Sequence, residues 1–370
     1  MAQQHLDPTD PTAEAVTVAA LADYLRAQAM EFLRALRLHR ETGGTAANGA
    51  EEFDAGRLLR RSARRISASL HTFRPLLDAD WSEEMRPELA WLSGTLGLEH
   101  ACEARLERLL LALHRLSGAT VLPAQAVDVA VAAGTRAAGA GRVREAAPDS
   151  TGGPAGATAT TERGNLTVGA AKAGALLERQ LTLARTRAHS TALQALGSAR
   201  FHAVADKVAV LASEVPLTPT APTTDLRPLA AAAEERLTDA VTALPLVTAG
   251  HPYNAEALVH GLSPDPSPHP QDGPWHQVRL LLRLHRYARE VLHGGNAPVD
   301  VRLLTAGQAL NRHRDASEAA AAAAQAARTP RITPATAYAL GVLHADQRHE
   351  VEAARFAFQQ AWQKQTVHAP

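Results

Sequence analysis

Hydrophobic residues recur every three or four positions along most of the chain, which is the spacing of an α-helix with one buried side. The clearest case is the stretch 56–77. Five apolar residues lie along one side of this predicted helix: Leu59, Ala63, Ile66, Leu70 and Phe73. Basic residues occupy the other side, with no acidic residue among them: Arg57, Arg60, Arg61, Arg64, Arg65 and His71. We therefore predict that this helix packs through its apolar side and directs its basic side at an anion.

A second predicted helix, residues 275–292, repeats the basic face. Four of its residues share one narrow face: His276, Arg279, Arg283 and Arg286. Shifting the first helix by 219 positions aligns Arg57, Arg60, Arg64 and Ser67 with these four. A single basic helix could be an ordinary solvated surface, but two matched helices favour an internal duplication with a shared binding cavity. Arg61 and Arg65 lie at the edge of the first basic stripe and could instead face outward.

Helical patterns also cover most of the remaining chain, and no alternating β-pattern of useful length occurs. Pro11, Pro298 and Pro334 are each expected at the start of a helix, because proline is tolerated in the first turn. Ser198 is expected to cap another. Helices are predicted at residues 11–42, 81–116, 166–198, 225–243, 251–262 and 319–327, the second of them long or broken. The predicted fold class is all-α.

Two stretches divide the chain. Residues 134–165 are crowded with Gly, Ala, Thr, Ser and Pro, a composition that buries too little apolar area to offset the entropy of ordering. We expect a disordered insertion there. Residues 216–224 form a Thr/Pro linker. The predicted halves are therefore 12–215, which contains the insertion, and 225–365.

Composition limits the function classes only weakly. The chain has 38 basic and 38 acidic residues and no formal net charge, so only local clustering can mark an anion-binding surface. Arginine far outnumbers lysine, which suits bidentate phosphate binding but also fits simple coding bias. A single cysteine excludes an intramolecular disulfide. The chain lacks a secretory signal pattern and an apolar run of about 20 residues, which predicts a cytoplasmic protein without membrane contact.

Motifs for catalysis and cofactor binding are absent from the sequence. There is no Walker loop, GxGxxG, GxSxG or HExxH motif. Glu290 and His293 form a Glu-x-x-His pair, but a di-iron bundle needs two such pairs. The histidines are scattered without paired ligand spacing. We therefore predict a protein that is not an enzyme, with no cofactor and no metal.

Several segments together resemble the conserved-histidine α-helical domain (CHAD) family. They occur in family order and include ARRISASLHTFRPLLD, ELAWLSGTLG, LQALGSARFH, HQVR with RLHRYARE, and ALNRHRDASEA. The resemblance implies two pseudo-symmetric four-helix-bundle halves around a basic central cavity. It also implies binding of inorganic polyphosphate.

The first half departs further from the family pattern than the second. Arg57 stands where the family has its histidine, and Ser67 where the last arginine of the helix is expected. His100 and Ala101 replace an Arg-Asp pair that the second half keeps as Arg314 and Asp315. We therefore expect the second half to contribute more to binding. The tunnel-type triphosphatases that accompany this family use a Glu-x-Glu-x-Lys strand, which the chain lacks.

The predicted function is non-enzymatic binding of inorganic polyphosphate in a cavity lined by Arg and His, with targeting to polyphosphate granules as one role. The predicted site is Arg57, Arg60, Arg61, Arg64, Arg65, His71, His276, Arg279, Arg283, Arg286 and Arg314. Nucleic acid is not expected as a ligand, because few aromatic residues are available to stack bases. The alternative is a degenerate helical scaffold that has lost polyphosphate binding and recruits a protein partner.

Overall fold

The computed structural model describes residues 16–42, 49–118, 155–221, 224–246, 248–251, 258–259, 261–262, 269–294 and 299–363. These residues are mainly helical. The only β-type pairing among them is one isolated antiparallel bridge between Leu77 and Leu217. The predicted all-α fold class is confirmed.

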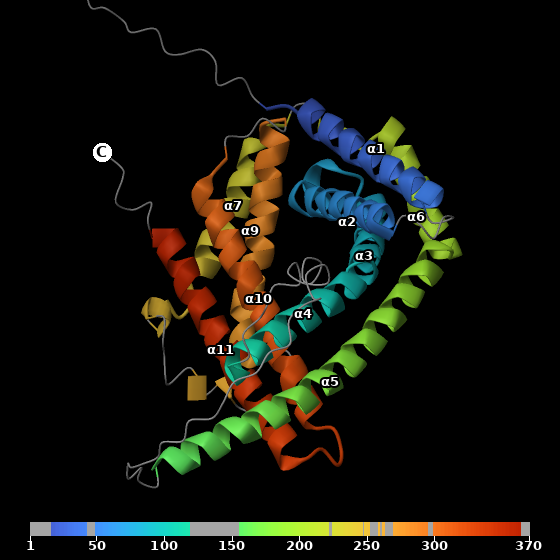
Figure 1. Ribbon diagram of the computed structural model, residues 1–370. Helices are drawn as coiled ribbons and strands as arrows, with labels where there is room; N and C mark the ends of the chain where they lie inside the picture. The colour runs from blue at the N-terminus through green and yellow to red at the C-terminus, as the bar shows by residue number, and fades with distance from the viewer. Residues whose placement is uncertain are drawn as a thin grey trace, which may run out of the picture.

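The α-helices follow one another along the chain with short connections, apart from the stretches outside the described residues. Their bounds are α1 Val18–Thr42, α2 Gly49–Thr72, α3 Ala79–Thr95, α4 Leu98–Ser117, α5 Ala155–Leu196, α6 Ala199–Ser213, α7 Arg227–Thr242, α9 Gly273–Leu292, α10 Val301–Ala327 and α11 Pro334–Gln363. Short 3₁₀ turns lie at Arg74–Leu76, Thr248–Gly250 and Pro270–Asp272. Figure 1 shows α5 as a long curved helix that passes the start of α11 and runs along one edge of the molecule to α6.

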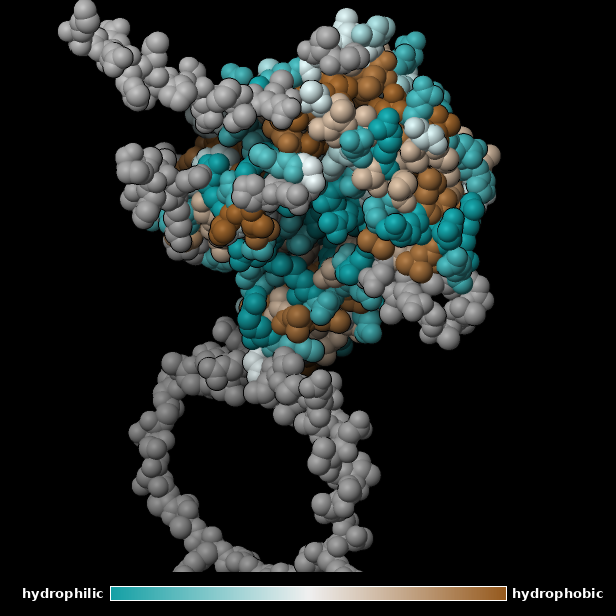
Figure 2. All heavy atoms as spheres, turned by 90° about the horizontal axis from the view of Figure 1, so that it is seen from above, coloured by the Kyte–Doolittle hydropathy of each residue, from teal (hydrophilic) through white to brown (hydrophobic). Residues whose placement is uncertain are grey.

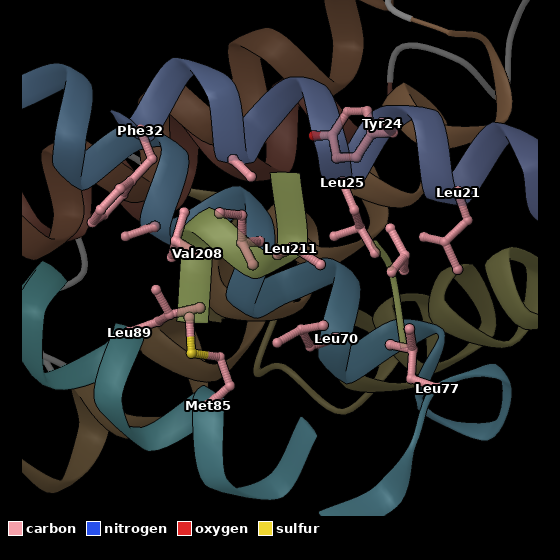
Figure 3. Packing of buried hydrophobic residues seen from close by; sticks show 14 of the residues in the cluster. Leu21, Tyr24, Leu25, Phe32, Leu70, Leu77, Met85, Leu89, Val208 and Leu211 are labelled. Atoms are coloured by element: carbon pink, nitrogen blue, oxygen red, sulfur yellow. The ribbon is translucent and has the colours of Figure 1, made fainter. Parts of the chain in front are cut away.

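One hydrophobic cluster joins α1, α2, α3 and α6. Phe32 of α1, Leu70 of α2, Met85 of α3 and Val208 of α6 are all fully buried in it. Figure 3 shows these side chains pointing toward one another from their four helices. The same cluster continues into α9 through Ala288 and Val291. The apolar back of α2 therefore holds that helix in a core shared with α9.

Two further clusters connect parts of the chain that lie far apart in sequence. Leu109 of α4 and Leu177 of α5 pack with Leu340 and Leu343 of α11. Another cluster joins α7, α9, α10 and α11. Helices of the predicted first half thus share a core with helices of the predicted second half. The division into halves and their pseudo-symmetry stay predictions.

Helix ends confirm some of the predicted boundaries. Ser198 caps α6, since its Oγ accepts a hydrogen bond from the backbone N–H of Phe201 at 3.2 Å. α11 begins at Pro334 as predicted. The predicted helix at 81–116 is broken into α3 and α4 around Leu96 and Gly97.

Two predicted boundaries differ from the structure. α10 begins at Val301 and not at Pro298, because the carboxylate of Asp300 accepts a hydrogen bond from the N–H of Leu303 and caps the helix there. α5 begins at Ala155, so the end of the predicted insertion is helical. Extending an existing helix fixes one residue per hydrogen bond, which costs less than nucleating a new one. The rest of the predicted insertion, like the predicted start at Pro11, lies outside the described residues.

Candidate functional site: an arginine-lined cleft

The two basic helices are seated through their apolar sides, as predicted. In α2, all five apolar residues assigned to the back are fully buried: Leu59, Ala63, Ile66, Leu70 and Phe73. In α9, the buried residues are Trp275, Val278, Leu282, Leu284, His285, Ala288 and Val291. Each fully buried large apolar side chain contributes about 1.5–3 kcal/mol relative to an exposed one. Because the apolar sides of α2 and α9 are buried in the core, the basic sides of both helices face away from it.

A cleft of about 810 Å³ lies where the basic sides of α2 and α9 meet, with further walls from α4 and α10. Eight predicted site residues line it: Arg60, Arg61, Arg64, Arg65, Arg279, Arg283, Arg286 and Arg314. Arg61 and Arg65 thus border the cleft. In total ten arginines and two carboxylates line it, an excess of eight positive charges. Figure 2 shows hydrophilic side chains gathered around a depression near the middle of one face of the molecule.

Three predicted site residues do not line this cleft. Arg57 borders a neighbouring pocket of about 460 Å³ between α2, α4 and α5. His71 lies near the end of α2, where its Nδ1 is 3.0 Å from Nη2 of Arg86. His276 lies at the start of α9 with its ring centroid 5.4 Å from that of the buried His313. A helical projection shows the angle of a side chain and hides its height along the axis, so it does not separate residues at the ends of a basic face from those in its middle. A role of these three residues in binding stays a prediction.

The innermost arginines lack carboxylate partners. Arg60 and Arg283 form no ion pair within the described part of the chain. Arg64 donates from Nε to Oγ of Ser93 at 2.9 Å, and Arg279 donates from Nη1 to Oδ1 of Asn311 at 3.5 Å, which is a long hydrogen bond. These guanidinium groups therefore keep most of their donors available to a ligand.

Burial and mutual repulsion both act on these groups. Burial lowers the pKa of Arg64, and the charges of Arg60 and Arg283 act in the same direction, which together bring it to about 9. The pKa of Arg279 falls to about 10 for the same two reasons, with Arg283 and Arg314 as its neighbours. Arginine remains protonated at neutral pH, so the cleft confines several like charges. A bound polyanion would relieve this repulsion.

Other arginines of the cleft are paired with acids. Arg65 donates to Glu290 from Nε at 2.7 Å and from Nη2 at 3.1 Å. Arg314 donates to Asp315, and Arg105 donates from Nη2 to Oε2 of Glu318 at 2.6 Å. The cleft therefore has two kinds of arginine: an unpaired group, Arg60, Arg64, Arg279 and Arg283, and an acid-paired group, Arg65, Arg105 and Arg314.

The prediction missed two arginines on α4. Arg105 and Arg108 also line the cleft. They are three residues apart and so share one face, which was a usable signal. Glu103 and Glu107 lie between and beside them in sequence and make the stretch look like a mixed, solvated surface.

A close approach between α2 and the α3–α4 junction positions Arg60. A Cβ atom added to Gly97 would lie 2.4 Å from Nη2 and 2.5 Å from Cζ of Arg60. The guanidinium of Arg60 therefore lies against bare backbone at Gly97. Any larger residue there would push the Arg60 side chain to a new position.

The described residues show neither a group of acidic, histidine or cysteine side chains arranged to hold a metal ion nor a helix suited to crossing a membrane. Arginine side chains dominate the lining of the cleft and offer hydrogen-bond donors and positive charge. Forked guanidinium groups bind phosphate oxygens in pairs, which gives both strength and geometry.

Comparisons with known proteins agree with this picture. A family model described as the CHAD domain matches residues 27–300. A solved structure of PptA from Streptomyces chartreusis is 68% identical in sequence, with a TM-score of 0.72, and the match covers 94% of the present chain and 99% of that chain. No curated protein matches the sequence.

Proposed function

The chain belongs to the CHAD domain family, and we propose that its arginine-lined cleft binds inorganic polyphosphate without making or breaking covalent bonds. The resemblance of the sequence to this family implies the ligand. The observation that carries the proposal is the group of unpaired arginines from α2 and α9 that border one cleft.

The proposed mechanism is electrostatic. The excess of eight positive charges is concentrated in one cleft, although the whole chain has no formal net charge. A linear polyphosphate carries roughly one negative charge per phosphate, and its oxygens repeat along the chain as acceptors for arginine forks. Binding would release the counterions condensed on the polyphosphate, which gives a favourable entropy at low salt.

Preference for polyphosphate over nucleic acid would follow from what lines the cleft. Arginines dominate the lining, and among the described residues that line it the only aromatic rings are those of Tyr287 and His100. Binding of single-stranded nucleic acid depends on stacking of successive bases on aromatic side chains. Phosphates without bases need no such platform. A role at polyphosphate granules is the cellular counterpart of this proposal.

A titration with polyphosphate at several salt concentrations tests the proposal. Affinity should fall steeply with salt, with a slope of log K against log salt of about −6 if all eight excess charges are neutralised, at about −0.7 per contact. A shallow slope would argue against charge pairing in the cleft.

Two further outcomes separate the alternatives. No binding at low salt would favour a helical scaffold that recruits a protein partner. Release of phosphate from the added polyphosphate would contradict the proposal that no bonds are broken. A matched titration with single-stranded DNA of equal charge should show much weaker binding.

A further inference from the structure

The arginine-lined cleft is bordered by a pocket of a different character. This second neighbouring pocket, distinct from the one at Arg57, has a volume of about 980 Å³ and lies between α1, α2, α9 and α10. It shares Arg61, Arg65 and Arg286 with the cleft. Its lining contains four arginines and four carboxylates. The positive excess of the cleft therefore disappears beyond the shared arginines.

The boundary is built by a cluster of three residues from three helices. Glu290 of α9 accepts two hydrogen bonds from Arg65 of α2, at 2.7 and 3.1 Å. It also accepts one from the hydroxyl of Tyr24 of α1, at 3.0 Å. The side chains of Arg65 and Glu290 are only 13% and 22% exposed, so both are held in place.

The cluster also keeps its protonation states. Burial raises the pKa of Tyr24 and the nearby Glu290 charge raises it further, so the phenol keeps its proton and remains a donor. Burial alone would lower the pKa of Arg65, but its hydrogen bond and charge pairing with Glu290 outweigh burial and raise it. The Arg65 guanidinium lies 5.2 Å from the centroid of the Tyr287 ring, which restrains its other face. The guanidinium of Arg65 is therefore paired with an acid, in contrast to those of Arg60 and Arg283.

We propose that the Arg65–Glu290–Tyr24 cluster ends the anion path, so that the cleft holds a segment of at most about eight phosphates and does not pass a longer chain on into the pocket between α1, α2, α9 and α10. This inference rests on the proposed function. Glu290 already neutralises the charge of Arg65, so this pair would offer no unpaired cation to a phosphate beyond the shared arginines and would place a carboxylate beside it. The other neighbouring pocket, which shares Arg60 with the cleft, has three arginines and two carboxylates and offers little more attraction.

The test uses linear oligophosphates of defined length, up to several times the length expected to fill the cleft. For the native protein, affinity should rise steeply with length to about eight phosphates and then change little, apart from the statistical gain of a longer chain. Glu290→Gln removes the negative charge of the carboxylate and weakens its two hydrogen bonds with Arg65. It should move the plateau to longer chains and strengthen binding of long chains several-fold, while the shortest chains change less than twofold.

Glu88→Gln is a matched control. Glu88 also accepts two hydrogen bonds from one arginine, from Nε and Nη2 of Arg200 at 2.6 and 3.0 Å, and it does not line the cleft. This variant should leave the length profile unchanged. The inference is overturned if the affinity of the native protein keeps rising steeply with length, or if Glu290→Gln strengthens all lengths equally. Absence of binding at every length would instead contradict the proposed function. If Glu290→Gln does not fold, the length profile of the native protein still decides.

Discussion

α2 and α9 border the same cleft with similar basic faces, yet they rest on different supports. The back of α2 is aliphatic and aromatic, with Leu59, Ile66, Leu70 and Phe73 fully buried. The start of α9 rests on a buried ionic cluster. Its centre is Asp272, which is 0% exposed and accepts hydrogen bonds from Arg348 at 2.8 Å and Arg355 at 2.7 Å, both on α11.

The ionic support reaches into α10 as well. Ser317 donates to Asp272 at 2.5 Å, and His313 Nε2 lies 3.6 Å from its carboxylate. The His313 ring also stacks on Trp275 of α9, with centroids 5.7 Å apart. This cluster fixes the first turn of α9 against both following helices.

The two supports should respond differently to change. An apolar core tolerates substitutions of similar volume, because no single partner is essential. A buried ionic cluster requires every partner, since removal of one leaves the others charged and unpaired away from water. Similar basic faces can thus be positioned by different physical means. We expect the stability of the protein to be more sensitive to substitutions in the ionic support of α9 than to substitutions of similar volume in the apolar support of α2.

The largest expected effect is at Asp272. Asp272→Asn keeps the shape but leaves Arg348 without its carboxylate partner, while Arg355 keeps Glu352 at 2.7 Å. The loss should lower the free energy of unfolding by about 3–5 kcal/mol. Urea unfolding at neutral pH measures it. Glu88→Gln, at an exposed pair, should cost less than about 1 kcal/mol. Equal costs for the two variants would show that the Asp272 cluster is not the support described here.

A smaller loss of folding stability should appear on acidification, through the buried His313. Burial lowers the pKa of His313 to about 4, against a partial opposing effect of Asp272. The unfolded chain, with a histidine pKa of about 6.5, therefore binds a proton more readily than the folded one. This contribution to stability is complete above about pH 6.5 and is lost as the pH falls toward 4, by up to about 3 kcal/mol.

Unfolding measured across this pH range would show the difference between the supports. His313→Gln should make the loss of stability on acidification shallower. Leu70→Ala, in the apolar support of α2, should lower stability by about 2–5 kcal/mol at every pH and leave the slope unchanged. If the free energy of unfolding changes with pH at the same slope in the native protein, His313→Gln and Leu70→Ala, the role given to His313 is contradicted.

The third effect is on binding. Replacing Arg279 and Arg283 with alanine should weaken polyphosphate binding at least roughly 10–100-fold, which is the loss expected from a single hydrogen bond to a charged group at about 1.5–3 kcal/mol. Replacing Arg57 and Arg64 with alanine should reduce the affinity for polyphosphate by a several-fold smaller factor, because only Arg64 of that pair lines the cleft. Fluorescence titration at low salt measures both. A larger loss from the Arg57 and Arg64 pair would reverse the expected asymmetry between the halves.

Much of the fold was predictable from local pattern. The apolar back of α2 was predicted residue by residue, because helical periodicity alone decides which side is buried. The caps at Ser198 and Asp300 show the limit of local rules. A serine cap was recognised, whereas a proline was preferred to the aspartate that in fact caps α10.

The candidate site was less predictable, since it depends on how helices cross. Arg60 and Arg279 were identified because each lies at the middle of a basic face. Arg105 was missed, as its role depends on the approach of α4 to α10, where Glu318 neutralises it. The Asp272 cluster was missed too, because its members come from three helices and form no pattern in sequence.

The unpaired arginines Arg60, Arg64, Arg279 and Arg283 are proposed to form a ligand site and not a structural network. Thermal unfolding at low salt, with and without polyphosphate, tests it most directly for the native protein and for the double variant Arg60→Gln with Arg279→Gln. For the native protein, ligand at a hundredfold excess over Kd should stabilise the fold by about 2.7 kcal/mol and raise Tm. The double variant should lose most of that shift while remaining as stable as the native protein without ligand, or slightly more so, because repulsion in the cleft is relieved. A double variant that is strongly destabilised without ligand would contradict the account, since these arginines would then be structural partners.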